Sequence, residues 1–203
     1  MKIICVGRNY IEHAEELHHA VPAKPLFFFK PDTALTSGED FYLPSFAERF
    51  EYECELVVKI CKVGKCIDRA FAKNYYNEVA IGLDITARDI QQKEISQGLP
   101  WTLSKAFDYS APVSEFIPLS SLGKEITNLD FALTKNGIRV QEANTGSMIF
   151  SVDEIIAYVS QFVTLKVGDL IFTGTPQGVG SININDHFAG YLEARPLLNL
   201  TIK

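Results

Sequence analysis

Short apolar runs bounded by polar or turn residues recur along the whole sequence. Runs rich in Val, Ile, Leu and Phe of this length are typical of β-strands. They predict strands at residues 2–6, 26–29, 53–61, 79–86, 131–135, 138–141, 169–173 and 197–203. Asn136-Gly137 stands between the fifth and sixth runs, and this dipeptide favours a two-residue hairpin turn.

Helical periodicity is rarer. Residues 10–17 predict a short amphipathic helix, and residues 87–97 predict a mostly polar one. Residues 151–154, Ser-Val-Asp-Glu, form a capping-box sequence ahead of an apolar stripe with helical spacing in residues 155–163. Many strands with few helices predict a mainly β protein with peripheral helices (α+β), built as a sandwich or roll. Because no repeat or break in composition divides the chain, we expect a single domain over residues 1–203.

Composition narrows the range of partners and compartments. Of the 203 residues, 47% are apolar and 22% charged, and the formal net charge is -6. An acidic balance argues against a nucleic-acid partner. The N-terminal apolar run is too short for a secretion signal, and no segment reaches the length of a membrane span, so we expect a cytoplasmic protein with no membrane partner. Of the four cysteines, Cys5, Cys54 and Cys61 resemble small core residues, and the spacing from Cys61 to Cys66 does not fit a zinc site.

Three glutamates alternate along the start of the third predicted strand. Because side chains alternate between the faces of a strand, Glu51, Glu53 and Glu55 are expected on one face, with neighbours about 7 Å apart at the backbone. A solvated edge strand is the commonest explanation of such a pattern. The alternative is a site that offsets the charges, because unpaired carboxylates would repel one another.

Asp84 favours the second explanation. It interrupts the apolar strand of residues 82–86, where a lone carboxylate needs a cation, a helix end or a metal. Arg88 and Lys105 follow within the next twenty-one residues. Three carboxylates without histidine or cysteine companions form a hard oxygen site, which suits Mg²⁺, Mn²⁺ or Ca²⁺ and disfavours zinc or copper.

Two further segments carry candidate chemistry. On a helical turn His13 and Glu16 are neighbours, and a carboxylate paired with imidazole produces a base that can activate water. Exposed short helices often carry the same pair without any such role. Residues 173–180 form a glycine-rich turn with threonine hydroxyls, but its spacing fits neither a phosphate-binding loop nor a nucleophile elbow.

Seven segments of the sequence together resemble the fumarylacetoacetate hydrolase family. They are VGRNYIEHAEE, PLFFFKP, FEYECELVVKI, GLDITARDIQ, GLPWTLSKAFD, NTGSMIFSVDEIIAYVS and GDLIFTGTPQGVG. They occur in the family's order and span nearly the whole chain. The sequence is most similar to the short, single-domain branch, which includes acylpyruvases and oxaloacetate decarboxylases.

The resemblance implies a mixed β-sandwich roll, usually a homodimer, with Mg²⁺ or Mn²⁺ at its active site. It implies metal ligands at Glu53, Glu55 and Asp84, a catalytic dyad at His13 and Glu16, a substrate-polarising lysine at Lys105, and substrate-binding residues at Arg88, Gln91 and Thr175. Glu51 falls where relatives usually carry Asp or His, and it is not expected among the ligands. The segment around His13 is expected to be a mobile lid.

The implied function is a divalent-metal-dependent hydrolase or lyase that cleaves C–C bonds of small 2-oxo acids. Acylpyruvate hydrolysis and oxaloacetate decarboxylation would both pass through a metal-stabilised enolate. An isomerase acting on a 2-hydroxyhepta-2,4-diene-1,7-dioate-type substrate is the alternative, since it needs the same metal and base but no water. A ligand-binding protein without activity is a third reading, which the intact set of carboxylates, dyad and lysine argues against.

Overall fold

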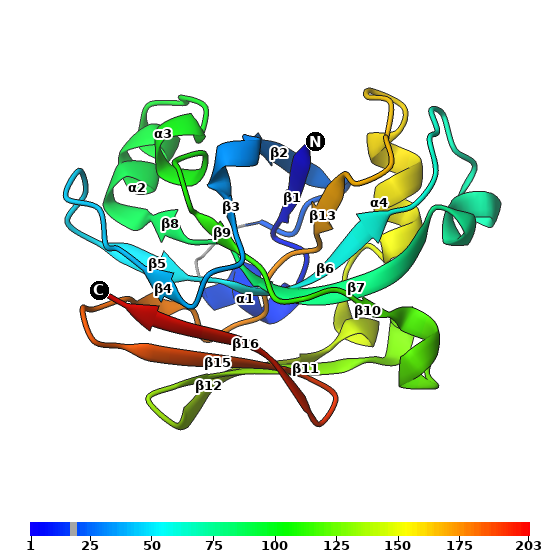
Figure 1. Cartoon of the computed structure of the whole chain (residues 1–203). Helices are drawn as coiled ribbons and strands as arrows, with labels where there is room; N and C mark the ends of the chain where they lie inside the picture. The colour runs from blue at the N-terminus through cyan, green and yellow to red at the C-terminus, as the bar shows by residue number, and fades with distance from the viewer. Residues whose placement is uncertain (17–19) are drawn as a thin grey trace.

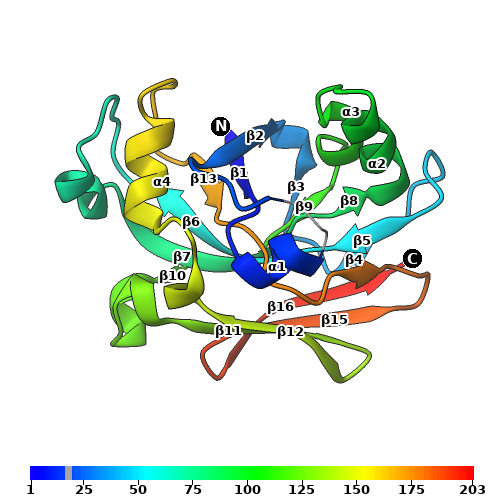
Figure 2. The ribbon, with the colours of Figure 1, turned by 180° about the vertical axis from the view of Figure 1, so that it is seen from behind.

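The computed structural model of the chain describes residues 1–16 and 20–203. Two large sheets are stacked in layers, and short helices flank the upper layer on both sides (Figures 1 and 2). The mainly β architecture with peripheral helices that the sequence predicts is confirmed. No helix in the described part of the chain is long and apolar enough to cross a membrane.

The upper sheet has six strands in the order β10-β7-β6-β13-β1-β2. Their bounds are β1 Ile3–Gly7, β2 Leu26–Lys30, β6 Cys54–Ile60, β7 Tyr76–Leu83, β10 Ile117–Pro118 and β13 Leu170–Phe172. Strand β1 runs parallel to β13, and the other pairs are antiparallel. The N-terminal strand therefore completes its sheet with a partner from the last fifth of the chain.

The lower sheet has five strands in the order β12-β11-β15-β16-β4. Their bounds are β4 Asp40–Phe41, β11 Asp130–Lys135, β12 Ile138–Asn144, β15 His187–Leu192 and β16 Arg195–Ile202. Asn136 and Gly137 join β11 to β12 with φ of 53° and 81°, so both adopt the left-handed conformation that a type I′ turn requires. The predicted hairpin is present.

Two small sheets and the helices complete the fold. One small sheet has the order β14-β5-β8 (Gly180–Ser181, Phe50–Tyr52, Thr86–Ala87), and the other pairs β3 (Leu35–Thr36) with β9 (Ala111–Pro112). The α-helices are α1 Ile11–Glu16, α2 Arg88–Ser96, α3 Thr102–Lys105 and α4 Val152–Val159. The 3₁₀ helices are η1 Asp32–Ala34, η2 Arg69–Asn74, η3 Leu119–Leu122, η4 Ile126–Asn128 and η5 Thr145–Ser147.

The two faces of the upper sheet have different surroundings. On β6, Leu56 and Val58 belong to the large core between the two sheets, whereas Val57 belongs to a smaller core on the opposite face. Strand β7 packs against β15 and β16 of the lower sheet. Glu55 is two residues from Val57, so the alternation of the strand places both on the face away from the lower sheet. The site described below is built on that face.

The structure differs from the sequence prediction in several local features. The capping box at Ser151 and Glu154 is formed, but α4 ends at Val159, and Phe162 is exposed beyond it. Strand β15 and helix α3 were not predicted, because the first has an interrupted alternation and the second is a single turn. The predicted end of the first helix at Leu17 lies outside the described residues.

The cysteines also differ in their surroundings. Cys5 and Cys54 are buried core residues, as expected, whereas Cys61 and Cys66 are exposed. The expectation that Cys61 belongs to the core is therefore wrong: β6 ends at Ile60, just before it.

Candidate active site

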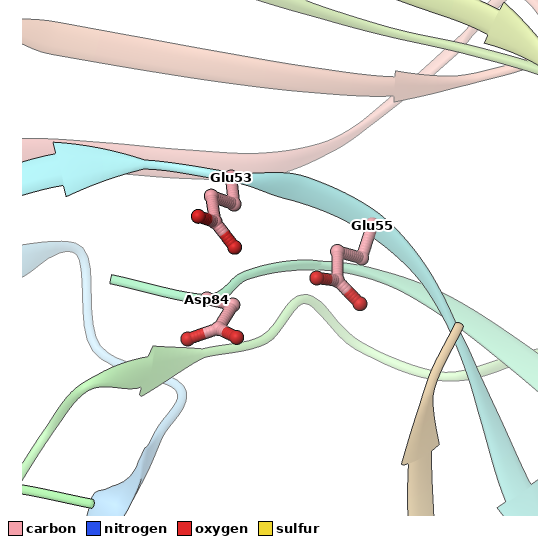
Figure 3. Close-up of side chains that lie close together, drawn as sticks. All are labelled: Glu53, Glu55 and Asp84. Carbon is pink, nitrogen blue, oxygen red and sulfur yellow. The ribbon is translucent and has the colours of Figure 1, made fainter. Parts of the chain in front are cut away.

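Three carboxylates converge on the outer face of the upper sheet. The register of β6 and β7 brings this about, because Glu55 pairs with Gly82 and the Asp84 N–H donates to the Glu53 carbonyl at 2.8 Å. Figure 3 shows the side chains of Glu53, Glu55 and Asp84 directed toward one another from these neighbouring segments. One oxygen from each can be chosen so that all lie within 4.8 Å of one another. All three side chains are buried.

Glycine at position 82 makes room for this arrangement. A Cβ at that position would lie 2.6 Å from Cε1 of Phe172 and 2.8 Å from Cγ2 of Val57, which is too close for either contact. The floor beneath Glu55 is therefore packed tightly by two apolar side chains of the smaller core.

Two buried lysines neutralise part of the acidic charge. Lys105 Nζ donates to Glu53 at 2.7 Å, to Asp84 at 2.9 Å and to the Thr86 hydroxyl at 2.6 Å. Lys30 Nζ lies 2.9 Å from Asp84 Oδ1 and donates to the hydroxyl of Ser110 at 2.8 Å. Lys30 was not among the residues that the sequence predicted. Its signal was a single lysine at the end of the apolar run LFFFK.

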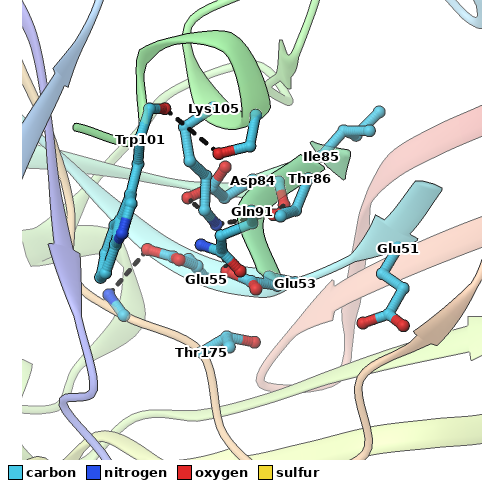
Figure 4. Close-up of polar contacts among 12 residues, drawn as sticks. Glu51, Glu53, Glu55, Asp84, Ile85, Thr86, Gln91, Trp101, Lys105 and Thr175 are labelled. Carbon is cyan, nitrogen blue, oxygen red and sulfur yellow. Dashed lines mark hydrogen bonds and ion pairs between the residues drawn. The ribbon is translucent and has the colours of Figure 1, made fainter. Parts of the chain in front are cut away.

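Arg88 binds the two glutamates on the other side of the cluster. Its Nη2 lies 2.5 Å from Glu53, its Nε 2.6 Å from Glu51 and its Nη1 2.5 Å from the Gln91 side-chain oxygen. Glu51 does not line the central pocket, and Figure 4 shows it apart from Glu53 and Glu55. Glu51 is therefore an ion-pair partner of Arg88.

Glu53 and Glu55 have opposite electrostatic environments. Burial acts to raise the pKa of Glu53, but the positive charges of Lys105 and Arg88 outweigh it and hold that pKa well below its usual range. Burial raises the pKa of Glu55, and the negative charges of Asp84 and Glu53 raise it further. Glu55 accepts one short hydrogen bond, at 2.7 Å from the Gly174 N–H. It is the carboxylate that would gain most from an added cation.

The donor set fits a hard divalent cation. Within the described residues this trio is the only group of three or more acidic, histidine or cysteine side chains close enough to share an ion. Asp84 Oδ1 is buried and has no hydrogen-bond partner of suitable geometry, although it is ion-paired with Lys30. Glu53 and Asp84 are ion-paired with the basic residues of this cluster, whereas Glu55 forms no ion pair with any described residue and is the carboxylate whose charge is left for a metal to offset. Carboxylate oxygens alone suit Mg²⁺ or Mn²⁺.

His13 and Glu16 form a pair at the edge of the same pocket. His13 Nδ1 lies 3.3 Å from Glu16 Oε2, and the His13 side chain is buried while Glu16 is partly exposed. The Gly178 N–H donates to Glu16 at 3.1 Å, so the glycine-rich segment fixes the carboxylate that orients the imidazole. A glycine is needed there, because φ is 95° and a Cβ would lie 2.2 Å from the Val140 carbonyl.

Thr175 belongs to the same glycine-rich segment. Its hydroxyl donates to the Cys54 carbonyl at 2.9 Å and accepts from Gln141 Nε2 at 2.9 Å. The Gln141 oxygen in turn accepts from the Cys54 N–H at 2.9 Å. Gln141 therefore holds Thr175 at the end of β6. No pattern in the sequence indicates this role, because Gln141 stands in an ordinary hairpin strand.

Helices α2 and α3 position the Lys105 side chain beside the three carboxylates. Glu94 of α2 is buried and accepts from the Leu103 N–H at 3.1 Å and from the Ser104 hydroxyl. The Glu94 carboxylate thus accepts from one backbone N–H and one hydroxyl at the start of α3, which has only one turn. Lys105 is the last residue of that turn, and Figure 4 shows its side chain extending from the helix to the carboxylates.

A pocket lies above the carboxylates. Every residue that the sequence predicted for the site lines it except Glu16, which contacts the lining residue His13. The other lining residues are Val6, Gly7, Arg8, Phe28, Ile95 and Trp101. The pocket is therefore charged at its floor and apolar along part of its wall.

The chain is similar over most of its length to known proteins. A family model described as fumarylacetoacetate (FAA) hydrolase C-terminal matches residues 2–203. The chain is 44% identical over 185 residues to oxaloacetate tautomerase FAHD1, mitochondrial, of Bos taurus, covering 91% of this chain and 83% of that protein. It is 40% identical over 183 residues to oxaloacetate decarboxylase, mitochondrial, of Dictyostelium discoideum, covering 89% and 84%.

A solved structure with a bound metal is also similar. It is fumarylpyruvate hydrolase from Pseudomonas aeruginosa in complex with Mn²⁺ and pyruvate. The two structures superpose with a TM-score of 0.92 at 34% sequence identity, covering 100% of this chain and 90% of that one. With the acidic trio, this neighbour supports a divalent metal in the family's site.

The comparisons contradict the predicted cytoplasmic location. The relatives from Bos taurus and Dictyostelium discoideum are both named as mitochondrial proteins. The prediction rested on finding no recognisable leader in the sequence, and that observation does not determine a compartment.

The resemblance seen in the sequence is confirmed as a family relationship. The family model covers nearly all of the chain, and the two relatives described above are 44% and 40% identical to it over most of their length. The superposition extends the agreement to the whole fold. The chain belongs to the fumarylacetoacetate hydrolase family.

Proposed function

We propose that this protein is a divalent-metal-dependent enzyme that cleaves a C–C bond of a small 2-oxo acid. Acylpyruvate hydrolysis and oxaloacetate decarboxylation are the two reactions of this class. The observation that carries the proposal is the convergence of three buried carboxylates beneath a pocket bordered by His13 and Lys105. The names of the relatives support it, since they include an oxaloacetate decarboxylase and a fumarylpyruvate hydrolase.

Glu53, Glu55 and Asp84 would hold the cation, and we propose Mg²⁺ or Mn²⁺ because all three donors are carboxylates. When bound, the ion would supply a Lewis acid that polarises the 2-oxo group and stabilises the negative charge left on the carbon next to that group when the C–C bond on its far side breaks. The Lys105 ammonium already lies among these carboxylates and adds positive charge to the floor of the pocket.

Arg88, Gln91 and Thr175 would orient the substrate above the floor. Arg88 and Gln91 are held together by a 2.5 Å hydrogen bond and come from the first turn of α2. The Thr175 hydroxyl reaches the pocket from the opposite segment and is held by Gln141. Groups fixed in this way lose little conformational freedom when a ligand binds, which favours precise positioning.

His13 would act as the general base in hydrolysis. Glu16 fixes its orientation, so one ring nitrogen faces Glu16 and the other is available to accept a proton from water. The resulting hydroxide adds to the distal carbonyl of an acylpyruvate, and the bond between that carbon and the central methylene breaks. The electron pair leaves on the methylene carbon as the enolate of pyruvate, a carboxylic acid departs, and protonated His13 can return the proton to carbon.

Cleavage of oxaloacetate requires fewer catalytic groups than hydrolysis of an acylpyruvate. Loss of CO₂ leaves the same enolate without any attack by water, so the base is not needed to break the bond. One site can therefore serve both reactions with different demands on His13.

A second candidate is proton transfer without C–C cleavage, and the oxaloacetate tautomerase among the relatives favours it. Interconversion of the keto and enol forms of oxaloacetate needs a base that removes a proton from carbon, and His13 is placed to do so. A dienoate isomerase is less supported, because the relatives with the higher sequence identities, 44% and 40%, are named for reactions of oxaloacetate.

A panel of assays with purified protein distinguishes these reactions. We expect acetylpyruvate or oxaloacetate to be cleaved with Mg²⁺ or Mn²⁺ and not after treatment with EDTA, with pyruvate as product. Enol absorbance followed before any pyruvate appears reports tautomerisation separately. Turnover that persists without divalent metal, or no turnover of any 2-oxo acid in the panel, would contradict the proposal.

Replacement of His13 by alanine tests the proposed base. We expect His13→Ala to lower kcat for acetylpyruvate hydrolysis by about 10²- to 10⁴-fold, since that is the usual contribution of a general base. Oxaloacetate decarboxylation should fall much less, because it needs no activated water. Equal losses on both substrates would show that His13 has a structural role, and Mg²⁺ binding by the variant serves as the control for an intact site.

The chain 1–203 is proposed to form one catalytic domain, and the two large sheets that share one core support this. A homodimer is proposed from the family resemblance alone. Light scattering of the purified protein at several concentrations measures its mass directly. The proposal that the segment around His13 is a lid likewise stays a prediction.

A further inference from the structure

Arg8 is a pocket residue that the proposed chemistry does not use. It follows β1 directly, with φ of 59°, in the left-handed region that residues other than glycine rarely occupy. This backbone conformation is unfavourable for a residue with a side chain, and it persists only where the surrounding structure fixes it. Strained residues of this kind are common at binding and catalytic sites, and the observed conformation therefore prompts a search for a role.

The surroundings fix the backbone on both sides of Arg8. The next residue, Asn9, is buried and donates from Nδ2 to the Thr173 carbonyl at 2.7 Å and to the Phe150 carbonyl at 3.0 Å. Its side-chain oxygen accepts from the Phe150 N–H at 2.8 Å. Asn9 thus ties the turn to the end of β13. The position of Arg8 is set by these bonds, and not by any bond of its own side chain.

The Arg8 side chain lines the pocket beside Trp101. Its guanidinium carbon lies 6.0 Å from the centre of the Trp101 ring, within the range of a cation–π contact. Its Nε is buried and has no hydrogen-bond partner among the described residues. A guanidinium with buried N–H capacity left unused is costly unless a ligand satisfies it.

Arg8 differs in this respect from the other cations that reach the site. Lys30, Lys105 and Arg88 each have at least one carboxylate within 2.9 Å. No carboxylate of the described residues forms an ion pair with Arg8. Arg8 is therefore the cation of the pocket lining that remains available to an anionic ligand group.

We propose that Arg8 binds the second carboxylate of a dicarboxylic 2-oxo acid and so determines which 2-oxo acids the enzyme prefers. This inference rests on the proposed function, which uses the carboxylate and keto group of the substrate at the acidic floor. A second carboxylate at the far end of the substrate then needs a separate cation along the wall. The planar guanidinium can bind it with two parallel hydrogen bonds, while Trp101 supports the opposite face.

Replacement of Arg8 by glutamine tests this specificity. Glutamine keeps a side chain on the left-handed backbone and removes the charge. We expect Arg8→Gln to lower kcat/KM for oxaloacetate by about 30- to 100-fold, mainly through KM, since a charged pair is lost. For acetylpyruvate, which has no second carboxylate, kcat/KM should change by less than about threefold. Arg8→Lys should recover part of the loss on oxaloacetate.

Arg69→Gln is the matched control. Arg69 lies outside the pocket and pairs with Glu154 through a side chain that is 64% exposed. This control variant should have the wild-type kcat/KM for both oxaloacetate and acetylpyruvate. Equal losses on oxaloacetate and acetylpyruvate in Arg8→Gln would overturn the proposal and assign Arg8 to packing against Trp101.

A binding measurement separates this inference from the proposed function. Trp101 is the only tryptophan of the chain, so its fluorescence reports ligands in the pocket without any turnover. With Mg²⁺ present, 2-oxoglutarate should bind the wild type at least tenfold more tightly than 2-oxobutyrate, and Arg8→Gln should abolish this preference. If neither substrate is turned over but the preference appears and is lost in the variant, only the proposed function fails. If the wild type shows no preference, the role of Arg8 is refuted.

Discussion

At the scale of single residues, Glu53 and Glu55 are two positions apart and yet have different ion-pair and hydrogen-bond partners. Glu53 is charged in the folded state because its ion pairs with Lys105 and Arg88 offset the free-energy cost of burying the charge. Glu55 is buried with one N–H donor and two acidic neighbours, and its pKa is raised, first by burial and then by Asp84. The sequence shows both as equivalent members of one alternating pattern. Their difference arises from side chains that are distant in the sequence.

This contrast predicts opposite effects of two matching substitutions. Glu55→Gln removes a carboxyl group whose ionisation is opposed by burial and by two acidic neighbours, while its amide oxygen can still accept from the Gly174 N–H, so metal-free protein should keep or increase its Tm. Glu53→Gln leaves Lys105 and Arg88 without their shared partner and should lower the free energy of unfolding by about 3 kcal/mol.

Thermal unfolding with and without Mg²⁺ measures both effects. Wild-type protein should gain Tm with Mg²⁺ concentration, and both variants should lose most of that gain because each lacks a ligand. A metal-induced increase in Tm that survives in both variants would show that the ion binds elsewhere. A metal-free Glu55→Gln protein that is strongly destabilised would contradict the electrostatic account of this position.

At the scale of elements, the site depends on short segments that have little stability of their own. Helix α3 is a single turn, and isolated turns of this length do not form in water. Glu94 of α2 supplies the missing stability by accepting from the Leu103 N–H and the Ser104 hydroxyl. The sequence could predict α2 from its length. It could not predict α3, because the stabilising partner belongs to another helix.

Replacement of Glu94 tests this dependence. We expect Glu94→Gln to destabilise the protein by about 1–2 kcal/mol, since the variant loses hydrogen bonds to a charged acceptor that is buried. Activity should fall as well, because Lys105 is the last residue of α3. The measurements are denaturant unfolding and kcat, with the exposed Glu142→Gln as the matched control. Unchanged kcat in the Glu94 variant would mean that the site positions Lys105 without help from α3.

At the scale of the whole molecule, sequence patterns predicted where strands occur far better than which strands pair in a sheet. The predicted fold class and the β11–β12 hairpin are confirmed, because alternation and turn residues are local signals. The order of the six-stranded sheet depends on contacts between distant segments, which no local pattern encodes. For the same reason the sequence suggested the three acidic residues but not Lys30, whose partner Asp84 is 54 positions away.

An ion pair between Lys135, at the end of β11, and Asp186, just before β15, contributes to the stability of the fold at low pH. Asp186 lies 2.8 Å from Lys135 Nζ and accepts from the Asn136 side chain at 2.9 Å and the Asn183 N–H at 2.7 Å. Burial acts to raise its pKa, but these donors outweigh it and lower the pKa in the folded state. Such a group stabilises the protein above its unfolded pKa of about 3.9, and the stabilisation is lost as pH falls through the lower folded value.

The pH dependence of an Asp186→Asn variant checks this assignment. At pH 7 we expect the variant to be less stable by about 1 kcal/mol, or roughly 2–4 °C in Tm. The difference should shrink as the pH falls below the unfolded pKa of about 3.9, because the carboxyl group is then protonated first in the unfolded state and only at lower pH in the folded state. A difference in Tm that stays constant across the same range would mean that the carboxylate charge does not contribute.

The pairing of β1 with β13 has a consequence for how the protein is made. During synthesis the first strand leaves the ribosome long before its parallel neighbour, whose register begins at Ile3 opposite Leu170. Glu53, Glu55 and Asp84 are also translated well before Gly174, whose N–H Glu55 requires. A nascent chain arrested before residue 170 would carry all three acidic side chains but lack the strand that seats them. The capacity to capture a metal should therefore arise late in translation, in one step, when β13 inserts between β1 and β6.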